Sequence, residues 1–276
     1  CPDQRRLPVV TTPRLYLPPP LPEQEICFLN ADHRHYLRHV LRLRSGDDLV
    51  LFDGSGWECA ARVEVLDDRE GKIRIVSRRA TSGPAVRITL AQALPKGAKM
   101  DGIVDKATEL GVSTIIPFVS RRSVPSWTAA KAAERTRRWE KIAVEAARRC
   151  RRPDLPVVAP VSSYRNMLAA AASPMGSTGD KASVGESLPV GKIVFWEEPG
   201  GQDIKILLRG QGGPPVAGYF LVVGPEGGLA ADEVGQARAA GFAVASLGRQ
   251  IFRVETAALV VLSIVQYELG SFSVAD

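Results

Sequence analysis

Two glycine-bearing stretches carry the strongest structural signal in this chain: Leu221-Val222-Val223-Gly224-Pro225-Glu226-Gly227-Gly228 and Leu247-Gly248-Arg249-Gln250-Ile251-Phe252-Arg253-Val254-Glu255-Thr256-Ala257. In each, an apolar run ends in glycine, which is typical of a buried strand that gives way to a tight loop before a helix. Glycine lets such a loop approach a ligand closely because it has no Cβ. Ligands of open α/β sheets bind at the ends of neighbouring strands, so the two stretches predict one shared pocket.

The composition is that of a soluble globular enzyme. The chain has 276 residues, of which 45% are hydrophobic and 24% are charged, and this length suits one large domain or two modest ones. It contains no stretch of 18 uncharged apolar residues, so we expect no membrane span. The chain opens with Cys1-Pro2-Asp3-Gln4-Arg5-Arg6, without an initiator Met or a signal-peptide core. We interpret this start as a trimmed or unusual N-terminus and not as a targeting signal.

The cysteines and histidines argue against a metal site. The four cysteines form no CxxC pair, which disfavours a disulfide scaffold, a thiolate zinc site or an iron–sulfur cluster and favours a cytoplasmic location. All three histidines lie in residues 33–39. His35 and His39 are one helical turn apart and could hold a metal, but a basic helix that faces nucleic acid is the favoured interpretation. We therefore predict no metal.

Positive charge is concentrated in one part of the chain. The net charge is +6, but residues 87–153 alone contain 15 Lys or Arg residues against 6 Asp or Glu residues. A basic block beside a ligand pocket indicates a polyanionic substrate, whereas the simpler interpretation is a solvated charged face.

Residues 1–84 are predicted to form a small β-barrel with one helix. Runs at 49–52, 57–65 and 73–76 predict strands, and Asp53-Gly54-Ser55-Gly56 predicts a hairpin turn. This turn resembles the acidic glycine motif of the common methyltransferase fold, but strand-like residues follow it where that motif needs a helix. Residues 32–42 predict the helix, with Asp32 near its N-cap.

Residues 85–276 are predicted to form an α/β domain with a mostly parallel sheet between helices. The predicted strands cover residues 86–93, 112–119, 193–196, 220–223 and 244–247, and the predicted helices 99–110, 128–150 and 256–269. The last helix is apolar on almost every side, which predicts cover from the core and from a second subunit. Residues 173–189 predict a flexible loop.

Several common catalytic motifs are missing from the sequence. There is no GxxxxGK[ST] P-loop, no GxSxG and no HExxH, so a P-loop ATPase and the usual hydrolases are unsupported. The α/β domain also has no histidine, so acyl transfer through a histidine base lacks its usual residue.

Several segments of the chain resemble the RsmE family. The most specific are the GPEGG stretch at 221–228, residues 247–257, Lys96-Gly97-Ala98-Lys99-Met100-Asp101 and Lys106-Ala107-Thr108-Glu109-Leu110-Gly111-Val112. Residues 36–47 are similar to that family's N-terminal PUA-like barrel, and residues 139–147 to its basic helix. The resemblance runs from about residue 14 to residue 269, with the motifs in the family's order.

The resemblance implies an activity and a fold that spacing alone does not show. The family consists of SPOUT-type methyltransferases, which use S-adenosyl-L-methionine to methylate N3 of a uridine in 16S ribosomal RNA of the small ribosomal subunit. It implies a PUA-like barrel in residues 1–84, a SPOUT domain with a deep trefoil knot in residues 85–276, and a homodimer with each cofactor near the interface. One departure is Leu229-Ala230-Ala231, where the family often has a Ser or Thr helix cap; Asp232 and Glu233 still favour the helix dipole.

The resemblance also implies which residues bind the cofactor. Backbone groups of the two glycine stretches would hold it, and Glu197 would close the ribose side. The candidates are Glu197, Val223, Gly224, Pro225, Glu226, Gly227, Gly228, Leu247, Gly248, Ile251 and Arg253. For Glu226 the favoured interpretation is that its carboxylate satisfies loop amides, and the alternative is that it orients the cofactor.

Arg253 is the candidate catalytic residue. Uridine N3 is a poor nucleophile until it loses its proton, and the resulting charge spreads onto O2 and O4, so a fixed cation would stabilise it. An ion pair with Glu255 or Glu226 is an equally good interpretation of Arg253. The proton acceptor is open, and bulk water could serve.

Seven basic residues are candidates for contact with RNA phosphates: Arg14, Arg38, Arg42, Lys96, Lys99, Arg121 and Arg122. Each taken singly is also consistent with a solvated charge. Two other functions stay open: a SPOUT methyltransferase that acts on transfer RNA or another base, and a non-catalytic RNA-binding or ribosome-assembly protein.

Overall fold

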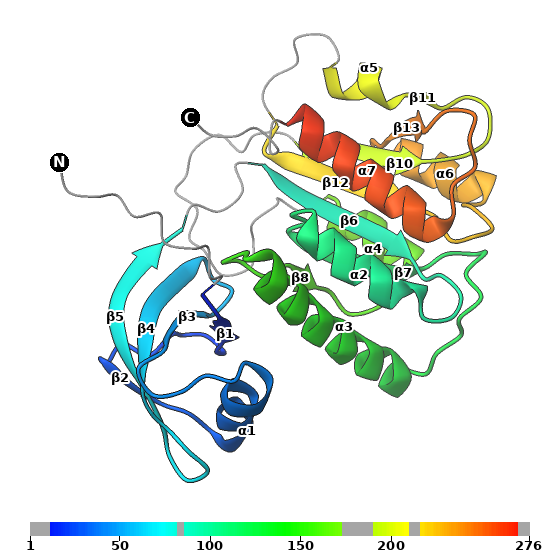
Figure 1. The fold of residues 1–276 in the computed structure, drawn as a ribbon. Coiled ribbons are helices and arrows are strands. Elements are labelled where there is room, and N and C mark those ends of the chain that lie inside the picture. The colour runs from blue at the N-terminus through cyan, green and yellow to red at the C-terminus, as the bar shows by residue number, and fades with distance from the viewer. Residues whose placement is uncertain (1–11, 82–85, 173–189, 210–215, 270–276) are drawn as a thin grey trace, which may run out of the picture. The chain divides into compact units, whose positions relative to one another are not determined.

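The computed structural model describes residues 12–81, 86–172, 190–209 and 216–269 (Figure 1). The predicted flexible loop at 173–189 lies outside these ranges. The chain divides into two compact units, residues 1–83 with 147–155 and residues 84–146 with 156–276. The first unit thus takes in nine residues, 147–155, that the sequence places in the second domain.

A curved, five-stranded mixed sheet forms the first unit. Its strands are β1 (Arg14–Tyr16), β2 (Ile26–Phe28), β3 (Asp48–Phe52), β4 (Trp57–Leu66) and β5 (Gly71–Ala80), in the order β1-β3-β4-β5-β2. β1 runs parallel to β3, and the other pairs are antiparallel. The turn between β3 and β4 is the predicted hairpin, because the Asp53 carboxylate accepts hydrogen bonds from the Ser55 N–H at 2.9 Å and hydroxyl at 2.6 Å.

The helix of the first unit differs from the prediction in its second half. It consists of α1 (Ala31–His35) followed by a π-helical turn, η1 (Tyr36–Val40). Asn30 caps it through a 2.8 Å hydrogen bond from the His33 N–H. Asp32 lies two residues further on, in the first turn of the helix, and is thus near the N-cap as predicted. The rings of His35 and His39 lie 4.6 Å apart, but no group of three metal-ligating side chains occurs in the described ranges.

The second unit is built on a sheet whose strand pairs are all parallel. The strands are β6 (Arg87–Ala93), β7 (Thr114–Val119), β8 (Val157–Val158), β9 (Ser162–Ser163), β10 (Val190–Phe195), β11 (Gln202–Asp203), β12 (Gly218–Val223) and β13 (Ala243–Ser246). Their order is β11-β13-β10-β12-β6-β7-β8, and β9 also pairs with β7. The predicted parallel α/β sheet is confirmed.

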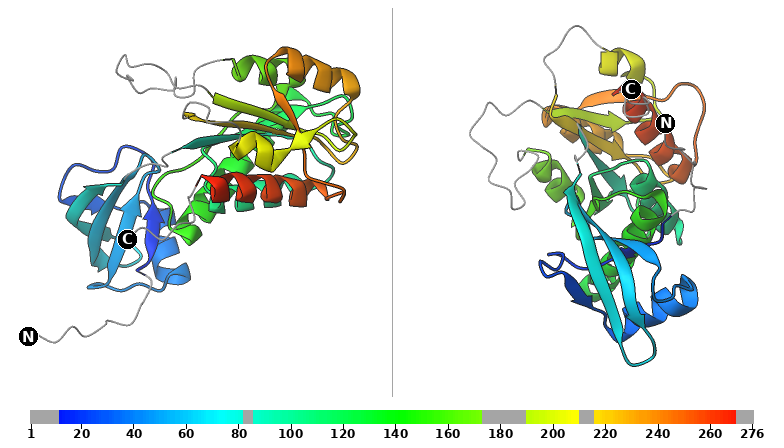
Figure 2. Two further views of the ribbon diagram at one scale, coloured as in Figure 1. Left: turned by 90° about the horizontal axis from the view of Figure 1, so that it is seen from above. Right: turned by 60° about the vertical axis from the view of Figure 1, so that its left-hand side comes forward.

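Helices cover both faces of this sheet (Figure 2). The helices are α2 (Lys99–Glu109), α3 (Ala129–Cys150), α4 (Tyr164–Ala170), α5 (Ile204–Arg209), α6 (Ala231–Ala239) and α7 (Val254–Glu268). One apolar core joins the sheet to α2, α3, α5 and α7, and the other joins it to α4 and α6. Three layers of this kind bury a parallel sheet on both sides. Within the described part of the chain, no helix is long and apolar enough to cross a membrane.

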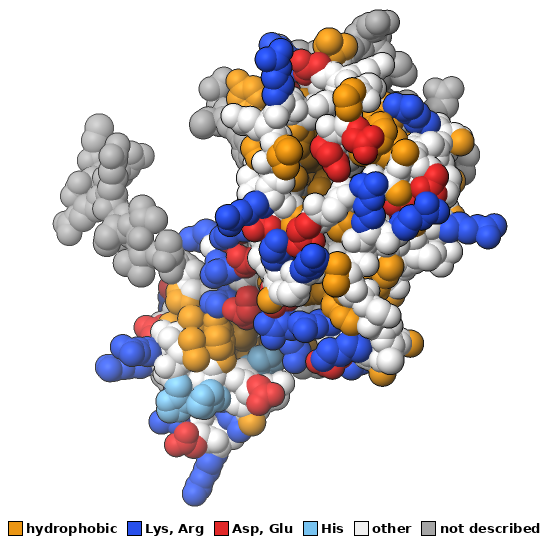
Figure 3. Space-filling model, turned by 90° about the vertical axis from the view of Figure 1, so that its right-hand side faces the viewer, with side chains coloured by type: hydrophobic (Ala, Val, Ile, Leu, Met, Phe, Trp, Pro, Cys, Tyr) orange, Lys and Arg blue, Asp and Glu red, His pale blue; other side chains and the backbone are white. Residues whose placement is uncertain are grey.

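Two surface features of the second unit bear on function. On α7, Leu259 and Val260 stay half-exposed although most of the helix is buried. Over this unit, Lys and Arg side chains alternate with Asp and Glu side chains on the face drawn in Figure 3. Positive and negative side chains are therefore interspersed on that face of the unit.

Candidate functional site

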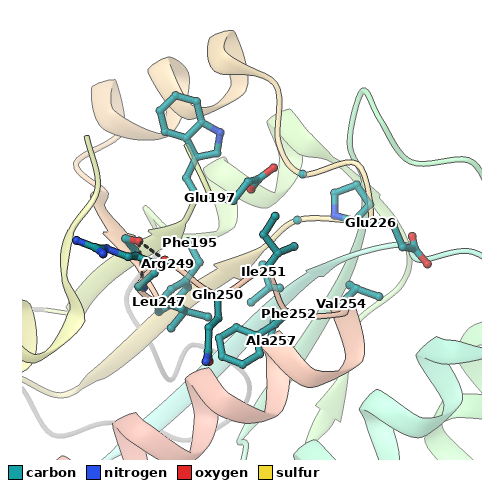
Figure 4. A pocket seen from close by; sticks show the side chains of 17 residues that line it. Phe195, Glu197, Glu226, Leu247, Arg249, Gln250, Ile251, Phe252, Val254 and Ala257 are labelled. Carbon is teal, nitrogen blue, oxygen red and sulfur yellow. Dashed lines mark hydrogen bonds between the residues drawn. The ribbon is translucent and has the colours of Figure 1, made fainter. Parts of the chain in front are cut away.

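A cavity of about 300 Å³ lies where β10, β12 and β13 end (Figure 4). Cavities of this size hold small molecules, usually in apolar walls with a few polar groups. The lining residues come from both glycine stretches, from the end of β10 and from the start of α7: Phe195, Trp196, Glu197, Val223, Gly224, Pro225, Glu226, Gly228, Ser246, Leu247, Gly248, Arg249, Gln250, Ile251, Phe252, Val254 and Ala257. The structure thus brings the two stretches together at one site.

The loop after β12 needs its glycines for tight packing. Gly228 has φ +68°, and a Cβ there would lie 1.7 Å from Oε1 of Glu197. A Cβ on Gly224 would lie 3.1 Å from the Leu229 backbone N. Glu197 therefore packs directly over the loop, and its carboxylate has no hydrogen bond or ion pair with any described residue.

A buried glutamine that the sequence analysis missed supports the same loop. Gln92, on β6, is fully buried, and its Nε2 donates to the carbonyls of Ala93 at 2.9 Å and Gly224 at 3.2 Å. Val223 O lies 3.5 Å from the same nitrogen. Oε1 of Gln92 is buried without a hydrogen-bond partner in the described structure. The only sequence signal was one polar residue in an apolar strand.

Glu226 is held by the loop after β6. Its carboxylate accepts hydrogen bonds from the Lys96 N–H at 3.1 and 3.2 Å and from Lys99 Nζ at 2.8 Å, and in Figure 4 it points away from the cavity. Burial raises the pKa of Glu226, but the hydrogen bonds from Lys99 and from backbone N–H groups outweigh burial, so its pKa is lowered. Glu226 thus satisfies a loop amide, as favoured from the sequence.

Two arginines from the loop after β7 also contact the segment after β12. Arg122 donates to Gly227 O at 2.8 Å, and Gly227 does not line the cavity. Arg121 forms a 2.8 Å ion pair with Asp232. Glu233 accepts hydrogen bonds from the backbone N–H groups of Arg121 at 2.9 Å and Ala230 at 3.0 Å. The Glu233 carboxylate therefore supplies part of the capping that Leu229-Ala230-Ala231 cannot.

The loop after β13 makes few contacts of its own. The Gly248 N–H donates to Ser246 Oγ at 3.2 Å, and the Ile251 side chain is 91% exposed. Eight residues that line the cavity were missed from the sequence: Phe195, Trp196, Ser246, Arg249, Gln250, Phe252, Val254 and Ala257. Five of them lie inside the second stretch, residues 247–257. The sequence therefore identified the correct segment, but too few of its residues were predicted to line the cavity.

Arg253 stands beside the cavity without lining it, although both of its sequence neighbours do. It occupies the N-cap position of α7, and its side chain is exposed. Among the described residues it forms no ion pair with Glu226 or Glu255. The cation beside these two carboxylates is Lys99, whose Nζ lies 2.8 Å from Glu226 and 3.7 Å from Glu255. The alternative ion-pair interpretation of Arg253 is therefore not what the structure shows.

Arg14 is not available for a phosphate, which corrects the prediction for this residue. It is only 6% exposed, it forms a 2.5 Å ion pair with Glu58, and it donates to Arg152 O at 3.0 Å. Glu58 also binds Arg79. Burial raises the pKa of Glu58, but the hydrogen bonds from Arg79 and Arg14 lower it further than burial raises it. Arg14 is thus part of the interior of the first unit.

The other candidates for phosphate contact lie at the surface, and some of them already form ion pairs or hydrogen bonds within the protein. Arg38 pairs with Asp68, and Lys99, Arg121 and Arg122 contact the residues named above. Lys96 and Arg42 are exposed, and Arg42 has the unusual φ of +56°. Non-glycine residues in this region of φ are uncommon and often mark functional positions.

Both units match known RNA methyltransferase domains. Residues 82–266 match the RNA methyltransferase domain family, and residues 29–76 match the RNA methyltransferase PUA domain family. The chain is 30% identical over 243 residues to ribosomal RNA small subunit methyltransferase E of Bacillus subtilis (strain 168), which covers 87% of this chain and 89% of that relative.

Solved structures show the same likeness in three dimensions. The crystal structure of a ribosomal RNA small subunit methyltransferase E from Neisseria gonorrhoeae bound to S-adenosyl methionine has a TM-score of 0.76 and 31% identity, covering 93% of this chain and 97% of that one. A putative methyltransferase from Legionella pneumophila, in complex with the same cofactor, has a TM-score of 0.77 and 26% identity, covering 94% and 98%. The chain belongs to the RsmE family of RNA methyltransferases with an N-terminal PUA domain.

Proposed function

We propose that this protein transfers a methyl group from S-adenosyl-L-methionine to N3 of a uridine in 16S ribosomal RNA of the small ribosomal subunit. The observation that carries the proposal is the cavity, which both glycine stretches line in a chain that matches family members over most of its length. Two relatives of known structure hold this cofactor.

The residues around the cavity fit the proposed cofactor. Apolar side chains from β10, the second stretch and α7 suit an adenine ring: Phe195, Leu247, Val254 and Ala257. The cofactor also carries a sulfonium and an ammonium group. Glu197 is a carboxylate at the cavity without a partner among the described residues, whereas Glu226 is already neutralised by Lys99. Glu197 therefore offers charge complementarity to a cationic ligand.

When bound, S-adenosyl-L-methionine supplies a methyl group that its sulfonium already makes electrophilic. The protein must then mainly align the reacting groups, an effect worth about 7–11 kcal/mol in well-oriented intramolecular reactions. The backbone of residues 223–226, 228 and 247–251 would hold the cofactor, and Glu197 would close its ribose side.

Arg253 stabilises the negative charge that develops on the uridine. Its side chain is exposed beside the cavity and engages no carboxylate in the described structure. A cation placed where charge develops lowers the barrier without having to reorganise during the reaction.

Basic residues on both units bind the RNA backbone: Arg38, Arg42, Lys96, Lys99, Arg121 and Arg122. Several of these side chains already contact carboxylates, so phosphates must compete with Asp68, Glu226 and Asp232. Binding should weaken steeply as salt rises, because each neutralised phosphate releases counterions.

The protein works as a homodimer in the cytoplasm, where ribosomal subunits are made. The half-exposed apolar side chains of Leu259 and Val260 on α7 support a subunit interface, since apolar helix faces are normally covered. The chain in the second unit is threaded as a trefoil knot, which brings the two stretches side by side.

The test combines labelled S-adenosyl-L-methionine with unmethylated 16S ribosomal RNA, assembled small subunits and transfer RNA. We expect label in 3-methyluridine from the small subunit or its RNA.

The role of Arg253 is tested by substitution. The variant Arg253→Met should lower kcat about 100-fold and leave the cofactor Kd within about twofold. The control is Arg238→Met, which replaces an exposed arginine of α6. Label found only in transfer RNA would refute the assignment of 16S ribosomal RNA as the substrate. If calorimetry detects no binding of the cofactor, the proposal that the protein is a methyltransferase would be refuted.

A further inference from the structure

We propose that Lys99 is a positioning residue that keeps Arg253 available to the substrate by occupying the two carboxylates that would otherwise capture it. The proposal rests on the function proposed above, in which Arg253 stabilises the negative charge on the uridine. It concerns a residue on α2 that lines no part of the cavity.

Lys99 connects three segments that are distant in the sequence. From the first turn of α2, its ammonium lies 2.8 Å from Oε1 of Glu226, in the loop after β12, and 3.7 Å from Oε2 of Glu255, in the first turn of α7. Oε2 of Glu255 is buried and accepts no hydrogen bond in the described structure. The lysine is therefore the cation that offsets the charge on both carboxylates.

Arg253 is a second cation close to Glu255 along the chain. It lies two residues before Glu255, at the N-cap of α7, and its long side chain is exposed and free of any ion pair with the described residues. Without Lys99, a buried carboxylate oxygen would face no opposite charge, which is unfavourable. An arginine prefers a carboxylate because its planar guanidinium can donate two hydrogen bonds to it. Arg253 would then turn from the substrate to Glu255 or Glu226.

The effect on catalysis follows from the strength of such a pair. If Arg253 is held in an exposed ion pair for most of the time, only a minority of the enzyme molecules have an Arg253 that can contact the substrate. We therefore expect kcat to fall about fivefold in Lys99→Met. The KM for RNA should change less than about twofold, because the RNA-binding surface keeps its other cations.

The decisive experiment removes the carboxylates as well. We expect the triple variant Lys99→Met/Glu226→Gln/Glu255→Gln to reach the kcat of Glu226→Gln, because Arg253 again has no acid to pair with. The single variant Glu226→Gln is the reference, since it measures the cost of weakening the loop after β12. Lys106→Met is the matched control, since Lys106 lies two turns further along α2 and forms a 2.9 Å ion pair with Glu109. That control should retain the wild-type kcat.

A crystal structure of Lys99→Met gives a readout independent of turnover, and should show the Arg253 guanidinium within ion-pair distance of Glu255 or Glu226. The proposal is overturned if Arg253 has the same position in the Lys99→Met structure as in the wild type. It is also overturned if the kcat of the triple variant is no higher than that of Lys99→Met. A raised KM with unchanged kcat would mean that Lys99 acts only as an RNA contact, and it would also overturn the proposal. A wild-type protein that methylates no RNA would refute the proposed function, while the crystal structure would still decide where Arg253 goes.

Discussion

The loop after β12 and the loop after β13 line the same cavity, but they are held in different ways. Gln92, Arg122, Lys96 and Lys99 all hydrogen-bond to residues 224–227 of the first loop. In the second loop, a Cβ added to Gly248 would meet no atom within 4 Å, and Ile251 is 91% exposed. The conformation of the first loop is fixed by hydrogen bonds from the rest of the protein, whereas the second loop has room to change conformation when a ligand or a partner subunit binds.

This difference indicates that the two loops have different roles when the ligand binds. A loop that is fixed before the ligand arrives costs little ordering entropy on binding, whereas a loop that settles around the ligand loses more entropy in return for closer contact. Substitutions in the first loop should therefore damage the site itself, and substitutions in the second should be better tolerated.

Exchange of one glycine in each loop should give the largest contrast. Gly228→Ala places a Cβ where the Glu197 carboxylate now lies and strains a residue with φ +68°, so we expect the cofactor to bind at least about tenfold more weakly. Gly248→Ala, at φ +94°, meets the same backbone strain but no atom within 4 Å. Calorimetric titration of both variants with S-adenosyl-L-methionine checks this, and equal losses in the two would contradict the comparison.

Removal of the amide under the first loop should have a smaller effect. Gln92→Met keeps the volume of the side chain but loses its hydrogen bonds to the carbonyls of Gly224 and Ala93, so cofactor binding should weaken about fivefold. The thermal midpoint should stay close to that of the wild type, because the substitution also removes the unpartnered buried Oε1. Thermal unfolding measured beside the titration separates the two effects; a large fall in midpoint would show that Gln92 mainly supports the fold.

The smallest effect concerns the stability of the first loop in acid. The pKa of Glu226 is lowered below its ordinary value of 4.5, so the carboxylate stabilises the folded state above that value and ceases to do so as the pH falls through its folded pKa. Between about pH 6 and pH 3 the wild type should lose about 0.5 kcal/mol more unfolding free energy than Glu226→Gln. Denaturant titrations at both pH values measure this difference, and identical losses would mean that the Glu226–Lys99 pair adds nothing to stability.

The sequence predicted most elements of the fold because its periodicities are local. The parallel strands and the long helices lie within a few residues of their predicted bounds, and the hairpin at Asp53-Gly54-Ser55-Gly56 is confirmed. The prediction for Arg14 was wrong because burial depends on partners far along the chain, here Glu58 and the Arg152 carbonyl. Lys99 was predicted as a phosphate contact and not as a partner of Glu226 for the same reason, since Glu226 lies 127 positions away.

The return of residues 147–155 to the first unit has a consequence for anyone who dissects the protein. Arg14 donates to the Arg152 carbonyl, and the Leu155 side chain lies against Gly54 while its N–H donates to Gly54 O at 3.0 Å. A fragment truncated at residue 83 would lack both partners. Residues 1–83 are consequently not a detachable module, and their expression as a stand-alone piece should require the missing nonapeptide, fused or added in trans.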